Sequence, residues 1–203
     1  ALNYYTVFSL GFLRYFVAAI VLIIAASIQK IGLPDLKDIP KFILSGLLGF
    51  TLYMITFNIG SKTLSSTTSS IIITTVPIIT ALIATVSLKE RLKALSWIAI
   101  LIEFSGILVL TLWNGIFSIN TGVLWMLAAA LLLSGYNITQ RQYTKKYTAF
   151  QSTTYSIIAG AVFLSIFSPE AISQIIQAPL DQVLVVIYLG IFPSAIAYIC
   201  WSK

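Results

Sequence analysis

The sequence contains no histidine, one cysteine and six acidic residues, and these scarcities exclude several kinds of chemistry. Without histidine, the chain lacks the side chain that most often moves protons or binds metals near neutral pH. The single cysteine, Cys200, cannot form a disulfide within the chain. Glycine-rich and Walker-type phosphate-binding patterns are also absent. We therefore expect no metal site, no cofactor and no ATP-driven machinery in this chain.

Apolar residues make up 59% of the chain and charged residues only 9%, and the mean hydropathy is +0.99. A helix needs roughly 20 apolar residues to cross the bilayer core, and seven stretches reach that length. We therefore predict an all-α integral membrane protein. Its seven transmembrane helices are expected at residues 8–29, 41–62, 66–88, 94–113, 121–140, 149–168 and 182–201.

Basic residues gather on every second connection between these helices. Cytoplasmic connections of membrane proteins are enriched in lysine and arginine, so this alternation predicts that the first helix runs inward. The net charge of +6 then follows from topology, and the expected partner is the lipid bilayer rather than nucleic acid. The predicted outer side carries Lys62, and the predicted inner side carries Lys30, Lys37, Lys41, Lys89, Arg91, Lys93, Arg141, Lys145 and Lys146.

The third predicted helix is unusually polar. It opens with six consecutive serine and threonine residues, 65–70, and continues through Thr74, Thr75 and Pro77. Small hydroxylated residues allow helices to pack closely, and Pro77 cannot donate to the carbonyl of Ile73, so a kink is expected. Two interpretations remain open: tight packing with hydroxyls bonded back to the backbone, or the wall of a cavity with a hinge.

Several segments together resemble the EamA repeat of the drug/metabolite transporters. Pro77 with Thr80–Leu82, the step 88–92, Trp97 and the ending 105–110 match this repeat. Gly11–Ala19 is similar to the arginine-bearing second helix of the family, and Tyr188–Tyr198 with Trp201 is similar to its eighth helix.

The resemblance implies ten helices in two inverted five-helix repeats, of which this chain would hold the second to the eighth. The first repeat would cover residues 1–118 and the second 119–203, with the break near 114–120. Internal symmetry supports this, because Gly46, Met54, Phe57 and Asn58 have the same spacing as Gly190, Tyr198, Trp201 and Ser202. The chain begins with Ala1 and stops directly after its last helix, so we expect a fragment that cannot transport by itself.

Polar and aromatic residues of four helices are our candidates for the lining of a substrate cavity. Hydroxyl and amide groups beside flat apolar surfaces suit amphipathic metabolites. The predicted substrate-binding residues are Tyr53, Phe57, Asn58, Thr74, Thr75, Pro77, Tyr136, Asn137, Gln140, Tyr198 and Trp201.

Three charged residues have competing interpretations. Glu103 lies within a predicted helix, where a carboxylate costs about 2.5–3.5 kcal/mol on insertion scales, so it is either a coupling residue or a protonated packing residue. Arg14 either snorkels to the outer headgroups, which we favour, or attracts anionic substrate groups. Glu90 more plausibly forms a structural ion pair with neighbouring basic residues than a reactive site.

The resemblance favours a secondary transporter, and an exporter in particular, of small metabolites such as amino acids or amines across a bacterial inner membrane. A seven-helix receptor is the alternative, although the last helix lacks a mid-membrane lysine for a retinal link. An intramembrane enzyme would need an arranged nucleophile, base or metal set, which the residues do not provide.

Overall fold

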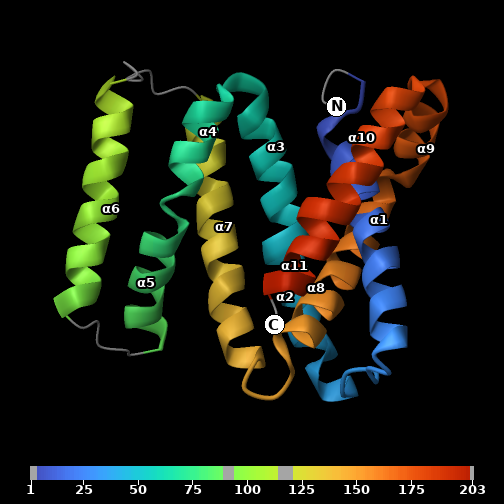
Figure 1. Ribbon diagram of the computed structural model, residues 1–203, viewed down its shortest axis with the longest axis horizontal. Coiled ribbons are helices and arrows are strands. Elements are labelled where there is room, and N and C mark those ends of the chain that lie inside the picture. Colours follow the sequence, from blue (N-terminus) through green and yellow to red (C-terminus); the bar gives the residue numbers. More distant parts are fainter. Residues whose placement is uncertain (1–3, 89–93, 114–120, 202–203) are drawn as a thin grey trace. The chain divides into compact units, whose positions relative to one another are not determined.

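The computed structural model describes residues 4–88, 94–113 and 121–201 (Figure 1). In this part, six helical segments are long and apolar enough to cross a membrane, which confirms an all-α, multi-pass membrane protein. The seventh predicted helix is α6, whose described apolar stretch, Ala94–Gly106, is shorter. The elements are α1 Val7–Ile28, η1 Leu36–Asp38, α2 Ile39–Gly46, η2 Leu47–Leu52, α3 Tyr53–Thr63, α4 Ser66–Ile73, α5 Val76–Ser87, α6 Ala94–Trp113, α7 Thr121–Tyr143, α8 Ala149–Leu164, η3 Ser165–Phe167, α9 Ser168–Gln177, α10 Leu180–Gly190, η4 Ile191–Ile196 and α11 Ala197–Trp201.

Local sequence sets where several helices begin and end. Helices α1, α4 and α8 follow Thr6, Ser65 and Thr148, whose hydroxyls each accept a backbone N–H of the first turn. At the other end of α1, Lys30 adopts a positive φ of 53°. The N–H groups of Lys30 and Ile31 bond back into the last turn, as in a Schellman motif, which glycine normally closes.

The chain forms two compact units: residues 1–55 with 139–203, and residues 56–138. In the first unit, α1 packs against α8, α9, α10 and η4, while α8 also packs against α2 and η2. Within this unit α1 and α10 run in one direction, and α2 and α8 in the other (Figure 1). Its core contains the fully buried side chains of Leu22, Phe50, Ile157 and Leu164.

Two glycines bring helices of the first unit into backbone contact. A Cβ at Gly46 would lie 2.6 Å from the carbonyl oxygen of Ser156 in α8. A Cβ at Gly190 would lie 2.6 Å from the Cβ of Val17 and 3.0 Å from the carbonyl oxygen of Arg14, both in α1. Small residues permit such close approach between membrane helices. We call these two contacts the α2–α8 joint and the α10–α1 joint.

Directly after each of these glycines, the helix widens into a π-helix of six residues. In η2 the Thr51 hydroxyl points back to the Gly46 carbonyl at 3.5 Å, and in η4 the Ser194 hydroxyl donates to the Leu189 carbonyl at 2.9 Å. π-Helical turns are rare and occur frequently at functional sites. The internal repeat seen in the sequence around Gly46 and Gly190 therefore extends to the backbone conformation.

The second unit is held together by contacts of α3 with α7 and of α4 with α6. Here too the helices approach through glycine: a Cβ at Gly60 would lie 3.1 Å from the carbonyl oxygen of Gly122. A Cβ at Gly122 would in turn collide with the hydroxyl of Thr63. The close approach of α3 and α7 therefore requires glycine at these positions, as at the two joints of the first unit.

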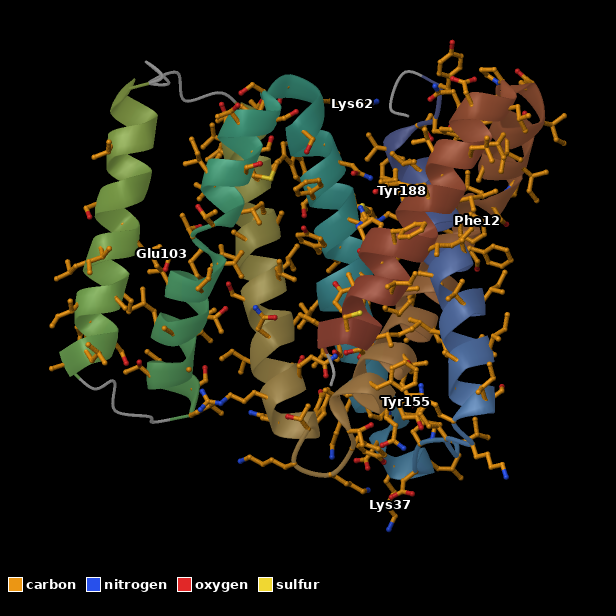
Figure 2. All side chains as sticks on the ribbon, in the orientation of Figure 1. Phe12, Lys37, Lys62, Glu103, Tyr155 and Tyr188 are labelled. Carbon is orange, nitrogen blue, oxygen red and sulfur yellow. The ribbon has the colours of Figure 1, made fainter. Side chains whose placement is uncertain are left out.

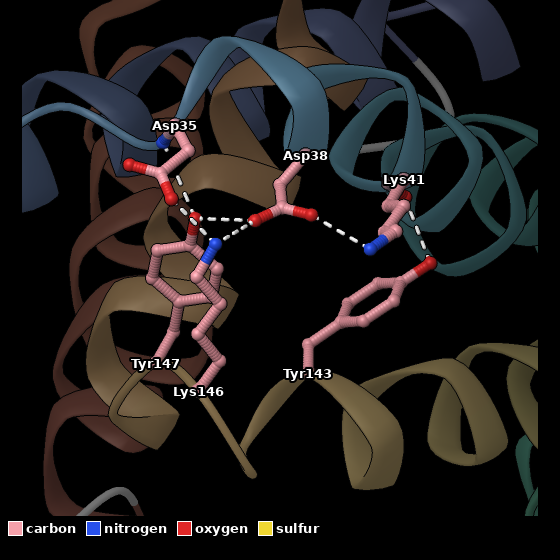
Figure 3. Close-up of polar contacts among 6 residues, drawn as sticks. All are labelled: Asp35, Asp38, Lys41, Tyr143, Lys146 and Tyr147. Atoms are coloured by element: carbon pink, nitrogen blue, oxygen red, sulfur yellow. Dashed lines mark hydrogen bonds and ion pairs between the residues drawn. The ribbon is translucent and has the colours of Figure 1, made fainter.

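Two connections predicted for the inner side meet in the first unit and form a polar network (Figure 3). Lys146 Nζ lies 2.5 Å from a carboxylate oxygen of both Asp35 and Asp38. The buried Asp38 also accepts the Tyr147 hydroxyl at 2.8 Å and pairs with Lys41 at 2.7 Å. The loop after α1 and the turn after α7 therefore lie at the same end of this unit, as the distribution of lysine and arginine predicts.

Candidate functional site

The α10–α1 joint carries a charge inside the membrane-spanning part of the first unit. Arg14 lies in α1, is half-buried, and donates from Nε to the hydroxyl of Ser194 at 2.6 Å. Ser194 is buried, and its hydroxyl donates a hydrogen bond to the Leu189 carbonyl in the π-helical turn. The widened turn thus places a hydroxyl where it fixes the guanidinium.

Aromatic rings surround this arginine. The guanidinium carbon lies 5.7 Å from the ring centroid of Tyr15, a distance at which cation–π attraction contributes. Tyr15 packs edge-on against Phe50, and Phe50 packs edge-on against Tyr198, with centroids 5.2 and 5.9 Å apart. The phenol groups of Tyr53 and Tyr198 lie within electrostatic range of Arg14 and of each other. A cation, three hydroxyl-bearing rings and apolar ring faces therefore meet at one place.

The structure brings together only some of the predicted substrate-binding residues. Tyr53 and Tyr198 share the surroundings of Arg14 in the first unit. Gln140, also in the first unit, lies apart from them in α7 and accepts a hydrogen bond from Ser152. Trp201 closes α11, but its side chain lies outside the described residues. The remaining predicted residues belong to the second unit: Phe57, Asn58, Thr74, Thr75, Pro77, Tyr136 and Asn137.

In the second unit, Thr74 and Thr75 separate α4 from α5 just before Pro77. Their hydroxyls donate to the carbonyls of Ile71 and Ile72, each at 2.6 Å. At the predicted kink the helix is thus broken by a turn of two residues, and the two hydroxyls satisfy carbonyls of the last turn of α4. These bonds match the first interpretation, hydroxyls bonded back to the backbone, and the wall of a cavity with a hinge stays a prediction.

Helix α7 contributes amide and hydroxyl groups that face α5 in the second unit. The buried Ser134 hydroxyl lies 3.2 Å from the Val76 carbonyl and 2.7 Å from that of Ala130. Asn137 Nδ2 lies 3.5 Å from the Thr80 hydroxyl, which is a long contact. These contacts place polar atoms of α7 against α5 close to Pro77.

The sequence analysis favoured snorkelling for Arg14, and the structure shows this to be wrong. Its Nε bonds to Ser194, far along a span that begins at Leu180 on the predicted outer side, so the side chain does not reach for the outer headgroups. The available signal was an arginine inside an apolar helix, which marks a functional site by default. Ser194 carries no such signal, because its role depends on the π-helical turn.

Glu103 lies on α6, away from the ends of that helix (Figure 2). It is half-buried, and within the described residues it makes no hydrogen bond or ion pair. The structure therefore assigns it no coupling partner. Glu90 and the repeat boundary at 114–120 lie outside the described residues.

Two apolar pockets open on the first unit, with volumes of about 360 and 480 Å³. Tyr155 lines the smaller and Phe12 the larger (Figure 2). Neither pocket includes Arg14 or any predicted substrate-binding residue. Their linings are almost entirely apolar and hold no charged side chain, so the arginine cluster is the stronger candidate site.

Comparison with known proteins gives relatives but no solved structure that matches the chain. The uncharacterized transporter YdfC of Bacillus subtilis is 34% identical over 96% of this chain. A probable terminal-alkyne amino-acid exporter of Streptantibioticus cattleyicolor is 30% identical over 99% of it, and an S-adenosylmethionine uptake transporter of Rickettsia bellii is 27% identical over 95%. The chain spans 64%, 68% and 64% of the lengths of these three relatives.

The family description matches the chain in two stretches, residues 1–112 and 120–203. Together they cover nearly all of the sequence, and the relatives found independently are named as transporters, not as enzymes. The chain belongs to the EamA-like transporter family.

Proposed function

We propose that the protein is a secondary transporter that exports small organic metabolites, amino acids or amines, across a bacterial cytoplasmic membrane by alternating access. The observation that carries this proposal is the pair of matched joints in the first unit. Each joint presses a glycine against a neighbouring helix and is followed by a π-helical turn.

The matched joints support two inverted repeats, residues 1–118 and 119–203. The α2–α8 and α10–α1 joints each join a helix of one proposed repeat to a helix of the other. The two glycine-bearing helices also run in opposite directions (Figure 1). Transporters built from inverted repeats bind substrate between the repeats and open alternately to either side. The two joints have the same local structure, and each repeat supplies the glycine of one of them. Such a matched pair could act as two hinges for that movement.

The substrate class and the direction of transport are also part of the proposal. The relative named as an amino-acid exporter is 30% identical, whereas the uptake transporter is 27% identical, so we favour export of an amino-acid-like solute. The cluster at Arg14 supports a small polar solute, because it combines one cation with phenol groups and ring faces.

Counterflow in proteoliposomes tests the proposal, using the natural protein that carries this sequence. Vesicles loaded with unlabelled amino acid or amine are diluted into a trace of the labelled compound. A secondary transporter accumulates the label transiently above the level in empty liposomes. Absence of accumulation for every compound of a broad panel, with protein shown to be folded by circular dichroism, would refute the proposal. Inside-out membrane vesicles then distinguish export from uptake.

A further inference from the structure

Among the described residues of the first unit, no acidic side chain pairs with Arg14. The hydrogen bond and ring contact given above, to Ser194 and Tyr15, are its short-range contacts there. At the centre of a membrane helix the charge of an arginine costs about 2.5–3.5 kcal/mol on insertion scales. A bound anion beside the guanidinium would offset this cost.

The α2–α8 joint shows that the charge is not required to pack such a contact. The Gly46 position touches the carbonyl of Ser156, just as the Gly190 position touches the carbonyl of Arg14. Ser156 is thus the counterpart of Arg14, and the α2–α8 joint closes with its neutral hydroxyl 3.0 Å from that of Ser45. Only one of two equivalent joints carries a cation, which points to a role in binding rather than in assembly.

The geometry of the guanidinium specifies which anion fits. Ser194 occupies Nε, so the two terminal Nη groups remain as a planar pair of donors. Such a fork matches the two oxygens of a carboxylate. The phenol groups of Tyr53 and Tyr198, which lie within electrostatic range, supply further hydroxyls beside it.

We infer that Arg14 binds the carboxylate of the transported metabolite, so that the protein selects amino acids and other carboxylic acids over amines that lack this group. The inference rests on the proposed transport function and narrows its substrate class. The Ser194 hydroxyl acts as a positioning group, because it holds the guanidinium in place through Nε.

Chemical footprinting tests the inference without requiring transport. Phenylglyoxal modifies accessible arginines, and mass spectrometry follows Arg14 separately from Arg141, an exposed residue that serves as the internal control. The probes are L-leucine, L-methionine and L-phenylalanine, each compared with its amide. We expect the acids to slow labelling of Arg14 but not of Arg141. Loss of a charge-assisted, two-pronged contact weakens binding roughly 10- to 100-fold, so the amides should protect only at correspondingly higher concentration.

Variants at the same position give the second readout, in counterflow with the same pairs of compounds. Arg14→Gln should abolish the preference for acid over amide, whereas Arg14→Lys should retain part of it because the charge remains. Arg14→Ser introduces the residue that stands at the equivalent position of the α2–α8 joint, Ser156. It provides a second neutral variant if the glutamine variant does not fold. Equal protection by acids and amides, or an unchanged preference in folded Arg14→Gln, would overturn the inference. Protection without flux would instead refute transport and leave carboxylate binding intact.

Discussion

A methyl group added at Gly46 is expected to force α2 away from α8 and to destabilise the protein. The new Cβ would lie 2.6 Å from the Ser156 carbonyl oxygen and 2.7 Å from the Gly160 amide nitrogen. The nearer distance is about 0.8 Å short of the 3.4 Å at which ordinary contact begins. Both atoms belong to the backbone, so no side-chain rotation can relieve the clash.

The size of the effect follows from two opposing contributions. Overpacking of a close contact costs about 1–3 kcal/mol, and alanine regains about 0.5–1 kcal/mol over glycine within a helix. Because both clashing atoms are backbone, the cost belongs in the upper part of its range, about 2–3 kcal/mol, and we expect Gly46→Ala to lower the free energy of unfolding by about 1–2.5 kcal/mol.

Gly106→Ala provides a matched control, because a Cβ at Gly106 in α6 meets no described atom within 4 Å. The same substitution should there be neutral or stabilise the protein by up to about 1 kcal/mol. Unfolding titrated with sodium dodecyl sulfate in mixed micelles and followed by circular dichroism measures both changes. Equal effects of the two substitutions, or a Gly46→Ala protein as stable as the wild type, would refute the account of the joint.

Four further substitutions test other features of the structure. Lys30→Gly should raise the free energy of unfolding by about 0.5–1 kcal/mol in the same titration, because glycine adopts the positive φ without strain; a loss of stability would contradict this. Ser134→Ala should cost about 0.5–1.5 kcal/mol through its buried hydrogen bonds, and an unchanged midpoint would show that they contribute nothing. Hydrogen bonds to two aspartates raise the pKa of Lys146 above its ordinary value, so its stabilising effect is full below pH about 10.4 and is lost as the pH rises further. Thermal melts of Lys146→Gln should therefore differ from those of the wild type at pH 7 and converge with them at high pH, whereas a constant difference would argue against the ion pairs. Glu103→Gln should leave the counterflow rate unchanged, since no described group pairs with this carboxylate; a large loss would restore it as a coupling residue.

The membrane architecture could be predicted from the sequence because it depends on local properties. The length of each apolar stretch sets the number of crossings, and the placement of lysine and arginine sets their direction. Starts of helices were equally readable in principle, since Thr6 and Thr148 act through neighbouring backbone groups. The resemblance to the EamA repeat, carried by short motifs in a fixed order, was confirmed by the family match.

The spacing shared by Gly46 and Gly190 was also visible in the sequence, but its meaning was not. Residues 47–52 contain no residue that marks a π-helical turn, and in residues 191–196 only Pro193 signals an irregular helix without specifying its type. The role of Arg14 was misjudged because its bonding partner, Ser194, is 180 residues away in the chain.

The sequence by itself thus determined that the chain consists of membrane-crossing helices and to which family it belongs, and it predicts their direction. Only the tertiary structure decided which polar groups meet. Hydrophobic length and charge bias act on each segment separately, whereas Arg14, Tyr53 and Tyr198 become neighbours only when α1, α3 and α11 pack together. Such packing depends on which glycines bring two helix backbones into contact, and the sequence does not say which helix each glycine meets.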